Sequence, residues 1–309
     1  MDTIAKSKLS PTANKNGTEV IVKQFRLTDI PDVMDILNWS QAARIMRRWI
    51  DGAPYEITSD IKRGDILPST LPKYATLEDL PFEWLFSGTT RIKPIIDNLK
   101  KELSLVRDYD KTVGRLPGTA VKISPGLKNF ISKLERLGVA NEHQQIISGS
   151  TYDFSNYSAI QLDEASQINR LIIGVGYWAQ ATDELDDVYG ALGGFAIKIA
   201  ATKFSTIHTP GLCSKIRIAE IGLYVRDTYD FLNTQDDQLL GYWGFKGVIR
   251  PGPIDYLTNP DFIDKDGDRY FRVTNNSFNN YRKTFKKGGD LVIFSSVYRF
   301  PVDIEINLQ

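Results

Sequence analysis

Two carboxylates and a phenol stand together in the segment Asp227-Thr228-Tyr229-Asp230. The preceding run, residues 216–225, is rich in β-branched and aromatic residues and predicts a strand with one buried face. The three side chains therefore lie where that strand gives way to a turn. Paired carboxylates can bind a hard cation such as Mg²⁺ or share a proton in acid–base catalysis. The sequence predicts Asp227, Tyr229 and Asp230 as catalytic residues.

A second acidic group precedes a glycine-rich turn and contains Asp186 and Asp187. If the strand after Gly194 pairs with the strand ending at Val225, both acidic groups reach one rim. The predicted ligands of magnesium, the expected cofactor, are then Asp227, Asp230, Asp186 and Asp187. The alternative is that these aspartates form Asx turns and cap helices.

The most basic segment lies at residues 276–290 and includes Arg282, Lys283, Lys286 and Lys287. Phe278, Tyr281 and Phe285 follow at helical spacing, which predicts an amphipathic helix resting on a sheet. One interpretation is a packed helix with a solvated basic face. The other is that Arg282 faces the aspartate rim and binds a phosphate or stabilises charge during catalysis.

Composition excludes several classes of protein. Lys plus Arg equals Asp plus Glu at 38 each, so no net field favours nucleic acid. A single cysteine and two histidines leave almost no room for a zinc site. The acidic run around Asp264 lacks the glutamate that closes a calcium-binding EF-hand loop, which favours an acidic hairpin turn. No nucleotide-binding or hydrolase signature of the common kinds is present.

The sequence has no apolar run long enough for a transmembrane segment, and its start lacks the apolar core of a secretory signal. We expect a protein that is cytoplasmic in the bacterium producing it and that, if delivered into target cells, travels without a cleaved signal peptide.

The order of patterns along the chain predicts an α+β fold. Residues 1–20 predict a flexible arm, and residues 21–140 a helical region, with helices around 31–37, 40–51, 92–103 and 127–134. Residues 52–90 are rich in proline and predict loops and short turns. Residues 141–309 predict a β-rich domain, a mostly antiparallel barrel-like or half-open sheet that carries the candidate site.

Several of these motifs, in one order, resemble a family of uncharacterised bacterial proteins, a domain of unknown function encoded beside type VI secretion genes. The likeness rests on the residues at 30–34, 39, 42–46, 49, 185–193, 226–231, 240–243, 278, 282, 288–290 and 294–295. It implies a setting in which proteins are delivered into competitor cells on contact. Asp290, within the shared Gly288-Gly289-Asp290, is predicted to bind substrate.

A second, local resemblance links Asp227-x-Tyr229-Asp230-Phe231 to the colicin M-type bacteriocins, magnesium-dependent phosphodiesterases that split the lipid-linked peptidoglycan precursor on a half-open barrel. In that family a His-Arg pair follows, where this chain has Asp236-Asp237. Either Arg226 or Arg282 substitutes, or the fold is shared and the chemistry is not. Arg226 is therefore predicted to bind substrate.

These observations lead to two expectations of function. The first is a type VI secretion-associated antibacterial effector, a metal-assisted hydrolase acting on a cell-envelope precursor, with a cognate immunity protein as partner. The alternative is a non-catalytic adaptor or binding protein that docks on the secretion spike, or an immunity protein.

Overall fold

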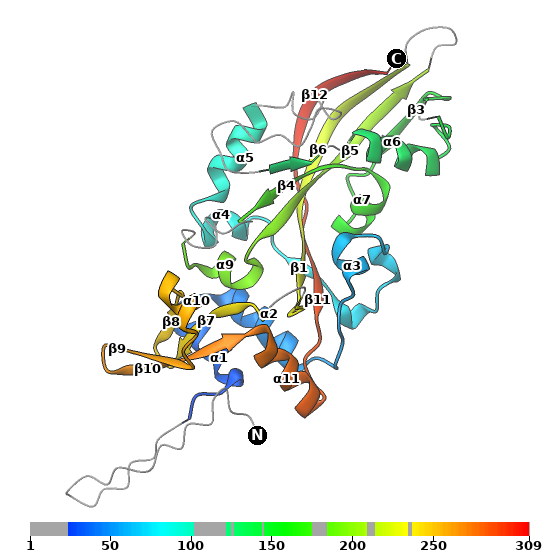
Figure 1. The fold of residues 1–309 in the computed structure, drawn as a ribbon. Coiled ribbons are helices and arrows are strands. Elements are labelled where there is room, and N and C mark those ends of the chain that lie inside the picture. The colour runs from blue at the N-terminus through cyan, green and yellow to red at the C-terminus, as the bar shows by residue number, and fades with distance from the viewer. Residues whose placement is uncertain are drawn as a thin grey trace, which may run out of the picture. The chain divides into compact units, whose positions relative to one another are not determined.

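The computed structural model describes residues 24–101, 122–124, 127–143, 145–174, 184–208, 214–233 and 237–308. The fold is mixed α+β, as predicted, with helices in the N-terminal half and a curled half-barrel sheet plus a smaller sheet in the C-terminal half (Figure 1). Contacts group the chain into two compact units. Unit 1 is Met1–Ile57 with Asp230–Asp290, and unit 2 is Thr58–Tyr229 with Leu291–Gln309. The predicted arm at 1–20 lies outside the described residues.

Unit 1 begins with a short 3-10 turn, η1 (Leu27–Asp29), and two helices, α1 (Ile30–Ile36) and α2 (Ser40–Asp51). Pro31 lies in the first turn of α1, where its missing N–H costs no helical hydrogen bond. The apolar residues of α2 recur at helical spacing and are all buried: Ala42, Ile45, Met46, Trp49 and Ile50. The helices predicted around 31–37 and 40–51 are confirmed.

The smaller sheet belongs to unit 1 and has the order β8-β7-β10-β9. Its strands are β7 (Leu239–Gly244), β8 (Gly247–Ile249), β9 (Phe262–Lys265) and β10 (Asp268–Thr274). Helix α10 (Pro253–Thr258) lies between β8 and β9 in the chain, and α11 (Asn275–Phe285) follows β10. Asp266 and Gly267 between β9 and β10 both have positive φ, 54° and 82°. Two such residues form the tight turn of a two-residue hairpin, so the predicted acidic hairpin turn is confirmed.

The larger sheet belongs to unit 2 and has eight strands. Its main path runs β1 (Thr76–Leu80), β11 (Leu291–Ser295), β6 (Ser214–Tyr229), β5 (Phe195–Ile207), β4 (Gln167–Ile173) and β2 (Lys122–Ser124), while β12 (Tyr298–Leu308) pairs with β6 and β3 (Ser150–Asp153) with β5. Every pairing is antiparallel except β1 with β11. The two longest strands, β5 and β6, form the spine of the sheet, and their buried isoleucines and valine supply its core.

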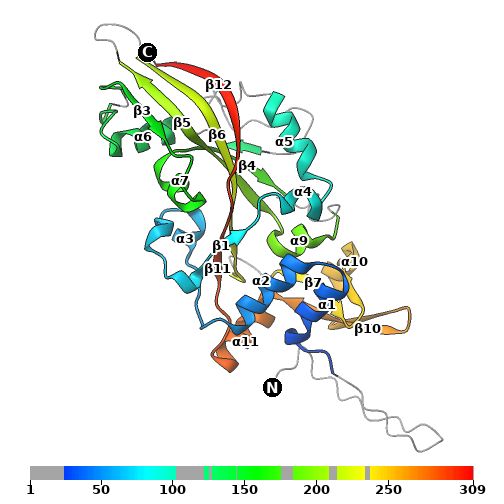
Figure 2. The same cartoon turned by 180° about the vertical axis from the view of Figure 1, so that it is seen from behind.

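Helices lie on both sides of this sheet. They are α3 (Ser59–Arg63), α4 (Trp84–Gly88), α5 (Ile92–Lys101), α6 (Leu127–Arg136), α7 (Ala159–Ala165) and α9 (Asp187–Leu192), with 3-10 turns η2 (Pro68–Thr70) and η3 (Lys73–Ala75). Figures 1 and 2 show α3, α6 and α7 on one side of β4, β5 and β6, and α4, α5 and α9 on the other. Helices α5 and α6 were predicted. Strand β1 and helices α3 and α4 occupy the segment predicted as loops and short turns.

Candidate functional site

The predicted catalytic segment does lie at the end of a strand. Strand β6 ends at Tyr229, with Asp227 opposite Ile293 and Tyr229 opposite Leu291 on β11. Asp227 and Tyr229 are two residues apart, so their side chains share one face of the strand, and both are partly buried. Burial raises the pKa of the Tyr229 phenol. Asp230 belongs to unit 1, where its Oδ1 accepts a hydrogen bond from the Leu232 N–H at 3.1 Å.

Asp186 and Asp187 are engaged at the start of α9. Asp186 is the N-cap of this helix and accepts a hydrogen bond from the Tyr189 N–H at 2.7 Å. Its carboxylate also lies 3.5 Å from the guanidinium of Arg91. Asp187 accepts a hydrogen bond from the Trp84 indole at 2.9 Å. The capping role, which was the alternative interpretation of these aspartates, is the one found for Asp186.

Magnesium was predicted to bind the carboxylates of Asp227, Asp230, Asp186 and Asp187. Among the residues that the structure describes, no group of three or more His, Cys, Asp or Glu side chains is arranged to hold a metal ion. Hard cations take several oxygen ligands from such groups, and magnesium binding at these four aspartates stays a prediction.

Arg282 and Asp290, two further predicted site residues, form a buried ion pair in unit 1. The Arg282 guanidinium on α11 donates to Asp290 and, at 2.8 Å, to the Gly288 carbonyl. Asp290 also accepts hydrogen bonds from the Trp49 indole at 2.8 Å and from the Ile57 N–H at 3.1 Å. The carboxylate is 1% exposed. Arg282 is therefore buried and bonded within unit 1. The lysines that follow it, Lys283, Lys286 and Lys287, are exposed.

Burial raises the pKa of Asp290 to about 6. The hydrogen bond from Trp49 and the charge of Arg282 act in the opposite direction, and the charge of Asp230 adds to the increase. Desolvation is the largest of these effects because the charged form of a carboxyl loses its hydration when it is removed from water.

A basic pocket in unit 2 contains Arg226, the remaining predicted substrate-binding residue. The cavity has a volume of about 600 Å³. Its floor is one face of the sheet, where Arg170 on β4 lies directly opposite Lys198 on β5. Lys198 is in turn opposite Tyr224 on β6, so Arg226, two residues further along, projects from the same face. Like charges opposite each other destabilise a sheet, so this arrangement has a cost in stability.

Helices and a loop complete the basic pocket. Helix α6 contributes Lys133 and Arg136, the C-terminal end of α3 contributes Arg63 and its C-cap Gly64, and α7 contributes Asp163 and Glu164. Gly64, with a φ of +89°, lies against the Arg226 guanidinium, so close that an added Cβ would be 3.3 Å from Nη2.

The carboxylate of Asp163 contacts several side chains of the pocket. It lies 3.4 Å from Arg226 Nε and 3.7 Å from Lys198 Nζ. The Tyr224 hydroxyl donates to it at 2.9 Å. Lys133 Nζ donates to the backbone carbonyl of Asp163 and, at 3.2 Å, to Gln167 Oε1. Lys133, Lys198 and Arg226 are each less than a tenth exposed. Two of these buried cations, Lys198 and Arg226, lie beside the carboxylate of Asp163, and the described residues that line the pocket include one other carboxylate, that of Glu164.

Burial has the expected effect on the two lysines. It lowers the pKa of Lys133 to about 8 and lowers the pKa of Lys198, because the ammonium form is disfavoured away from water. In both cases the charge of Asp163 acts in the opposite direction. The negative charge of Asp163 therefore offsets only part of the effect of burial on these two lysines.

The sequence prediction included Arg226 and missed the rest of this pocket. A signal was present, because Lys198 and Arg170 each stand inside an apolar strand segment, at 195–201 and 168–173. A charged residue inside such a strand is rarely buried without a partner or a role. The register that aligns the two strands is set by the folded sheet and is not visible in the sequence.

No helix in the described part of the chain is both long and apolar enough to cross a membrane.

Comparisons with known proteins place the chain in a family. No curated protein and no solved structure matches the sequence. Residues 25–309 match the model of a family of unknown function, DUF6402. Since the match covers most of the chain, the protein belongs to this DUF6402 family.

Proposed function

We propose that unit 2 binds a small phosphate-bearing molecule in the basic pocket. The observation that supports this is the surplus of buried positive charge, because Lys133, Lys198 and Arg226 share the pocket with only two carboxylates among its described lining residues, those of Asp163 and Glu164. A buried charge without a counter-charge destabilises a protein strongly. A bound anion would supply the missing negative charge.

Phosphate is the anion that best suits these donors. The Arg226 guanidinium is planar, and such groups bind phosphate through paired N–H donors. The ammonium groups of Lys133 and Lys198 add compact charges on other sides of the cavity. Each of the three groups comes from a different element, α6, β5 and β6, so the fold fixes their mutual positions.

Calorimetric titration with inorganic phosphate tests this proposal. Lys198→Met and Arg226→Met should each weaken phosphate binding by about tenfold or more, because a hydrogen bond to a charged group contributes about 1.5 to 3 kcal/mol. Lys203→Met is the matched control, since Lys203 lies on the same strand but pairs with Glu220 outside the pocket. Absence of phosphate binding to the wild-type protein would refute the proposal.

The basic pocket also suits the effector role inferred from the sequence. A hydrolase acting on a phosphorylated cell-envelope precursor needs positive groups that hold the phosphate, and we extend the proposal to an antibacterial effector of a type VI secretion system. Its partners would be spike or adaptor proteins and a cognate immunity protein. Asp227 and Tyr229 alternate with Arg226 along β6 and so lie on the opposite face of the strand from the basic pocket. The Asp227, Tyr229 and Asp230 segment is therefore proposed as a separate place of chemistry.

Expression in a susceptible bacterium distinguishes an effector from the alternatives. The protein is produced once in the cytosol and once with an added periplasmic signal. A growth defect in either compartment that disappears in Asp230→Ala, with an unchanged melting temperature, supports the effector. No defect in either compartment supports an adaptor or binding protein, and protection from a neighbouring gene product supports an immunity protein.

A further inference from the structure

A second hollow adjoins the basic pocket in unit 2. It has a volume of about 270 Å³ and lies between α6 and α7. Lys133, Arg136 and Glu164 line both cavities. A ligand whose phosphate lies in the basic pocket can therefore extend past these three side chains into the second hollow.

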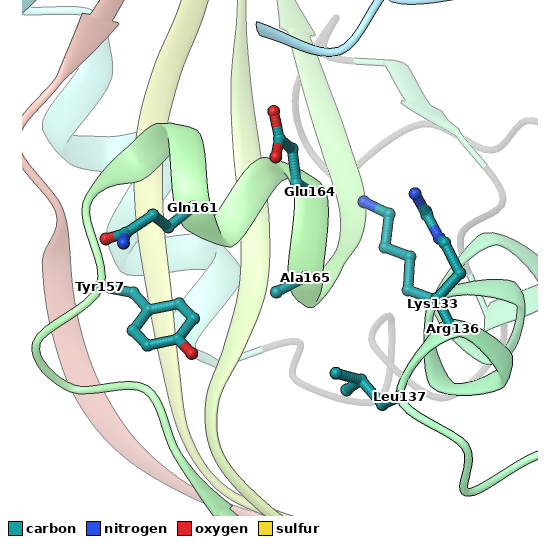
Figure 3. Close-up of a pocket in the computed structure, with 7 residues that line it drawn as sticks. All are labelled: Lys133, Arg136, Leu137, Tyr157, Gln161, Glu164 and Ala165. Carbon is teal, nitrogen blue, oxygen red and sulfur yellow. The ribbon is translucent and has the colours of Figure 1, made fainter. Parts of the chain in front are cut away.

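The walls of the second hollow differ from those of the basic pocket. Figure 3 shows the Tyr157 ring on one side, Lys133 and Arg136 on the other, and Ala165 between them. Leu137 adds an apolar surface. The small side chain of Ala165 lies between the two walls, so the hollow presents an aromatic ring on one side and a guanidinium on the other.

The Tyr157 ring is held in a fixed position. It stacks on Phe154 with ring centroids 4.4 Å apart and an interplanar angle of 15°. The backbone of the same residue is also held, because the Tyr157 carbonyl accepts a hydrogen bond from Arg299 Nη2 at 2.7 Å. Ordering this side chain before the ligand arrives reduces the entropy lost on binding.

From this arrangement we propose that the ligand is a nucleoside phosphate, with its phosphate in the basic pocket and its base in the second hollow near Tyr157 and Arg136. This inference rests on the proposed function of the basic pocket. Aromatic rings and arginine guanidinium planes are the two protein groups on which nucleobases stack most readily. Stacking tolerates different bases, so the structure identifies the class of ligand and not one base.

The test compares three ligands by calorimetry: inorganic phosphate, ribose 5-phosphate and adenosine 5′-monophosphate. The nucleotide should bind the wild-type protein at least about tenfold more tightly than phosphate does. Ala165→Leu should remove this advantage by filling the hollow while leaving phosphate affinity unchanged. Tyr157→Ser should have the same effect through loss of the stacking surface, and thermal unfolding of both variants shows whether they fold.

The outcomes separate the two proposals. If phosphate and nucleotide bind equally well, or ribose 5-phosphate binds as tightly as the nucleotide, the inference about the base is wrong and the phosphate site remains. If none of the three binds, the proposed function itself is wrong. A nucleotide advantage that survives in folded Ala165→Leu and Tyr157→Ser places the base elsewhere and also overturns the inference.

Discussion

Trp49 and Asp290 are joined by a buried hydrogen bond in which the indole Nε1 donates to Oδ1 at 2.8 Å. The Trp49 ring also packs edge-on against Phe231 and Phe278. Both glycines before Asp290 lie too close to neighbours for a side chain, since a Cβ on Gly288 would meet the Trp49 ring at 2.7 Å and one on Gly289 would meet the Ala53 carbonyl at 2.5 Å. The Gly-Gly-Asp sequence is therefore a packing motif of unit 1.

Gly288→Ala should destabilise the protein by about 2 to 4 kcal/mol. The residue has a φ of +99°, which strains any side chain, and the added methyl overlaps the Trp49 ring. Gly267→Ala is the control, because Gly267 also has a positive φ, +82°, but has no atom within 4 Å of the added Cβ. It should cost only about 1 kcal/mol. Urea unfolding measures both, and equal losses would show that the Trp49 contact is unimportant.

Asp290→Ala should destabilise the protein by about 3 to 5 kcal/mol, because it removes the buried partner of Arg282 and leaves only the exposed carboxylate of Glu56, 3.6 Å away, near this charge. Asp51→Ala is the control in the same unit. Asp51 is mostly exposed and lies 3.8 Å from Lys287, so its loss should change the unfolding free energy by less than about 0.5 kcal/mol. A small effect of Asp290→Ala would mean that water or another group compensates Arg282.

The free energy of unfolding should decrease as pH rises from about 4 to about 7 because of Asp290. Its folded-state pKa is raised from 3.8 to about 6, so the folded protein holds this proton over a range in which the unfolded chain has released it. The raised pKa corresponds to a contribution of about 3 kcal/mol. Urea unfolding across this range, with Asp290→Asn as reference, isolates the contribution. A wild-type minus variant difference that does not change with pH would contradict it.

Local structure could be predicted from the sequence because it depends on local spacing. The helical recurrence of Ala42, Ile45 and Trp49 predicted α2. The acidic run around Asp264, which lacks the glutamate that closes an EF-hand loop, predicted the hairpin turn. Shorter elements such as β1 and α7 were missed. Five to seven residues give too few repeats to establish a period.

The basic pocket could not be predicted because it depends on strand register. Arg170, Lys198 and Arg226 are separated by 28 residues at each step, and only the pairing of β4 with β5 and of β5 with β6 brings them to one face. The two units are also discontinuous in sequence. A division of the chain into consecutive segments at residues 20 and 140 cannot describe units that each combine two separate stretches.

Sulfate binding should weaken as pH rises from about 7 to about 9.5. The pKa of Lys133 is lowered to about 8, so this side chain loses its charge within that range, whereas sulfate keeps a constant charge. Lys198, whose pKa is also lowered, adds to the effect. Lys133→Arg should reduce the pH dependence, because arginine stays protonated, and calorimetry at several pH values measures both proteins. Identical pH dependence in the two proteins would exclude Lys133 from the anion site.

Asp163→Asn should lower the free energy of unfolding of the ligand-free protein and at the same time raise its affinity for an anion. The carboxylate compensates Lys198 and Arg226, so its loss from the ligand-free protein should cost about 3 kcal/mol. The amide keeps an oxygen that can accept the Tyr224 hydroxyl, which limits the change to charge. A bound sulfate then becomes the main negative charge in the cavity, and its affinity should rise by about tenfold, or about 1.4 kcal/mol.

Thermal unfolding with and without sulfate measures both effects, because a ligand that binds the folded state raises the melting temperature. Tyr224→Phe, which removes the hydrogen bond from Tyr224 to Asp163 and leaves the charge of Asp163, is the control and should not increase the affinity. Weaker sulfate binding in Asp163→Asn would mean that Asp163 positions the cations and does not compete with the ligand.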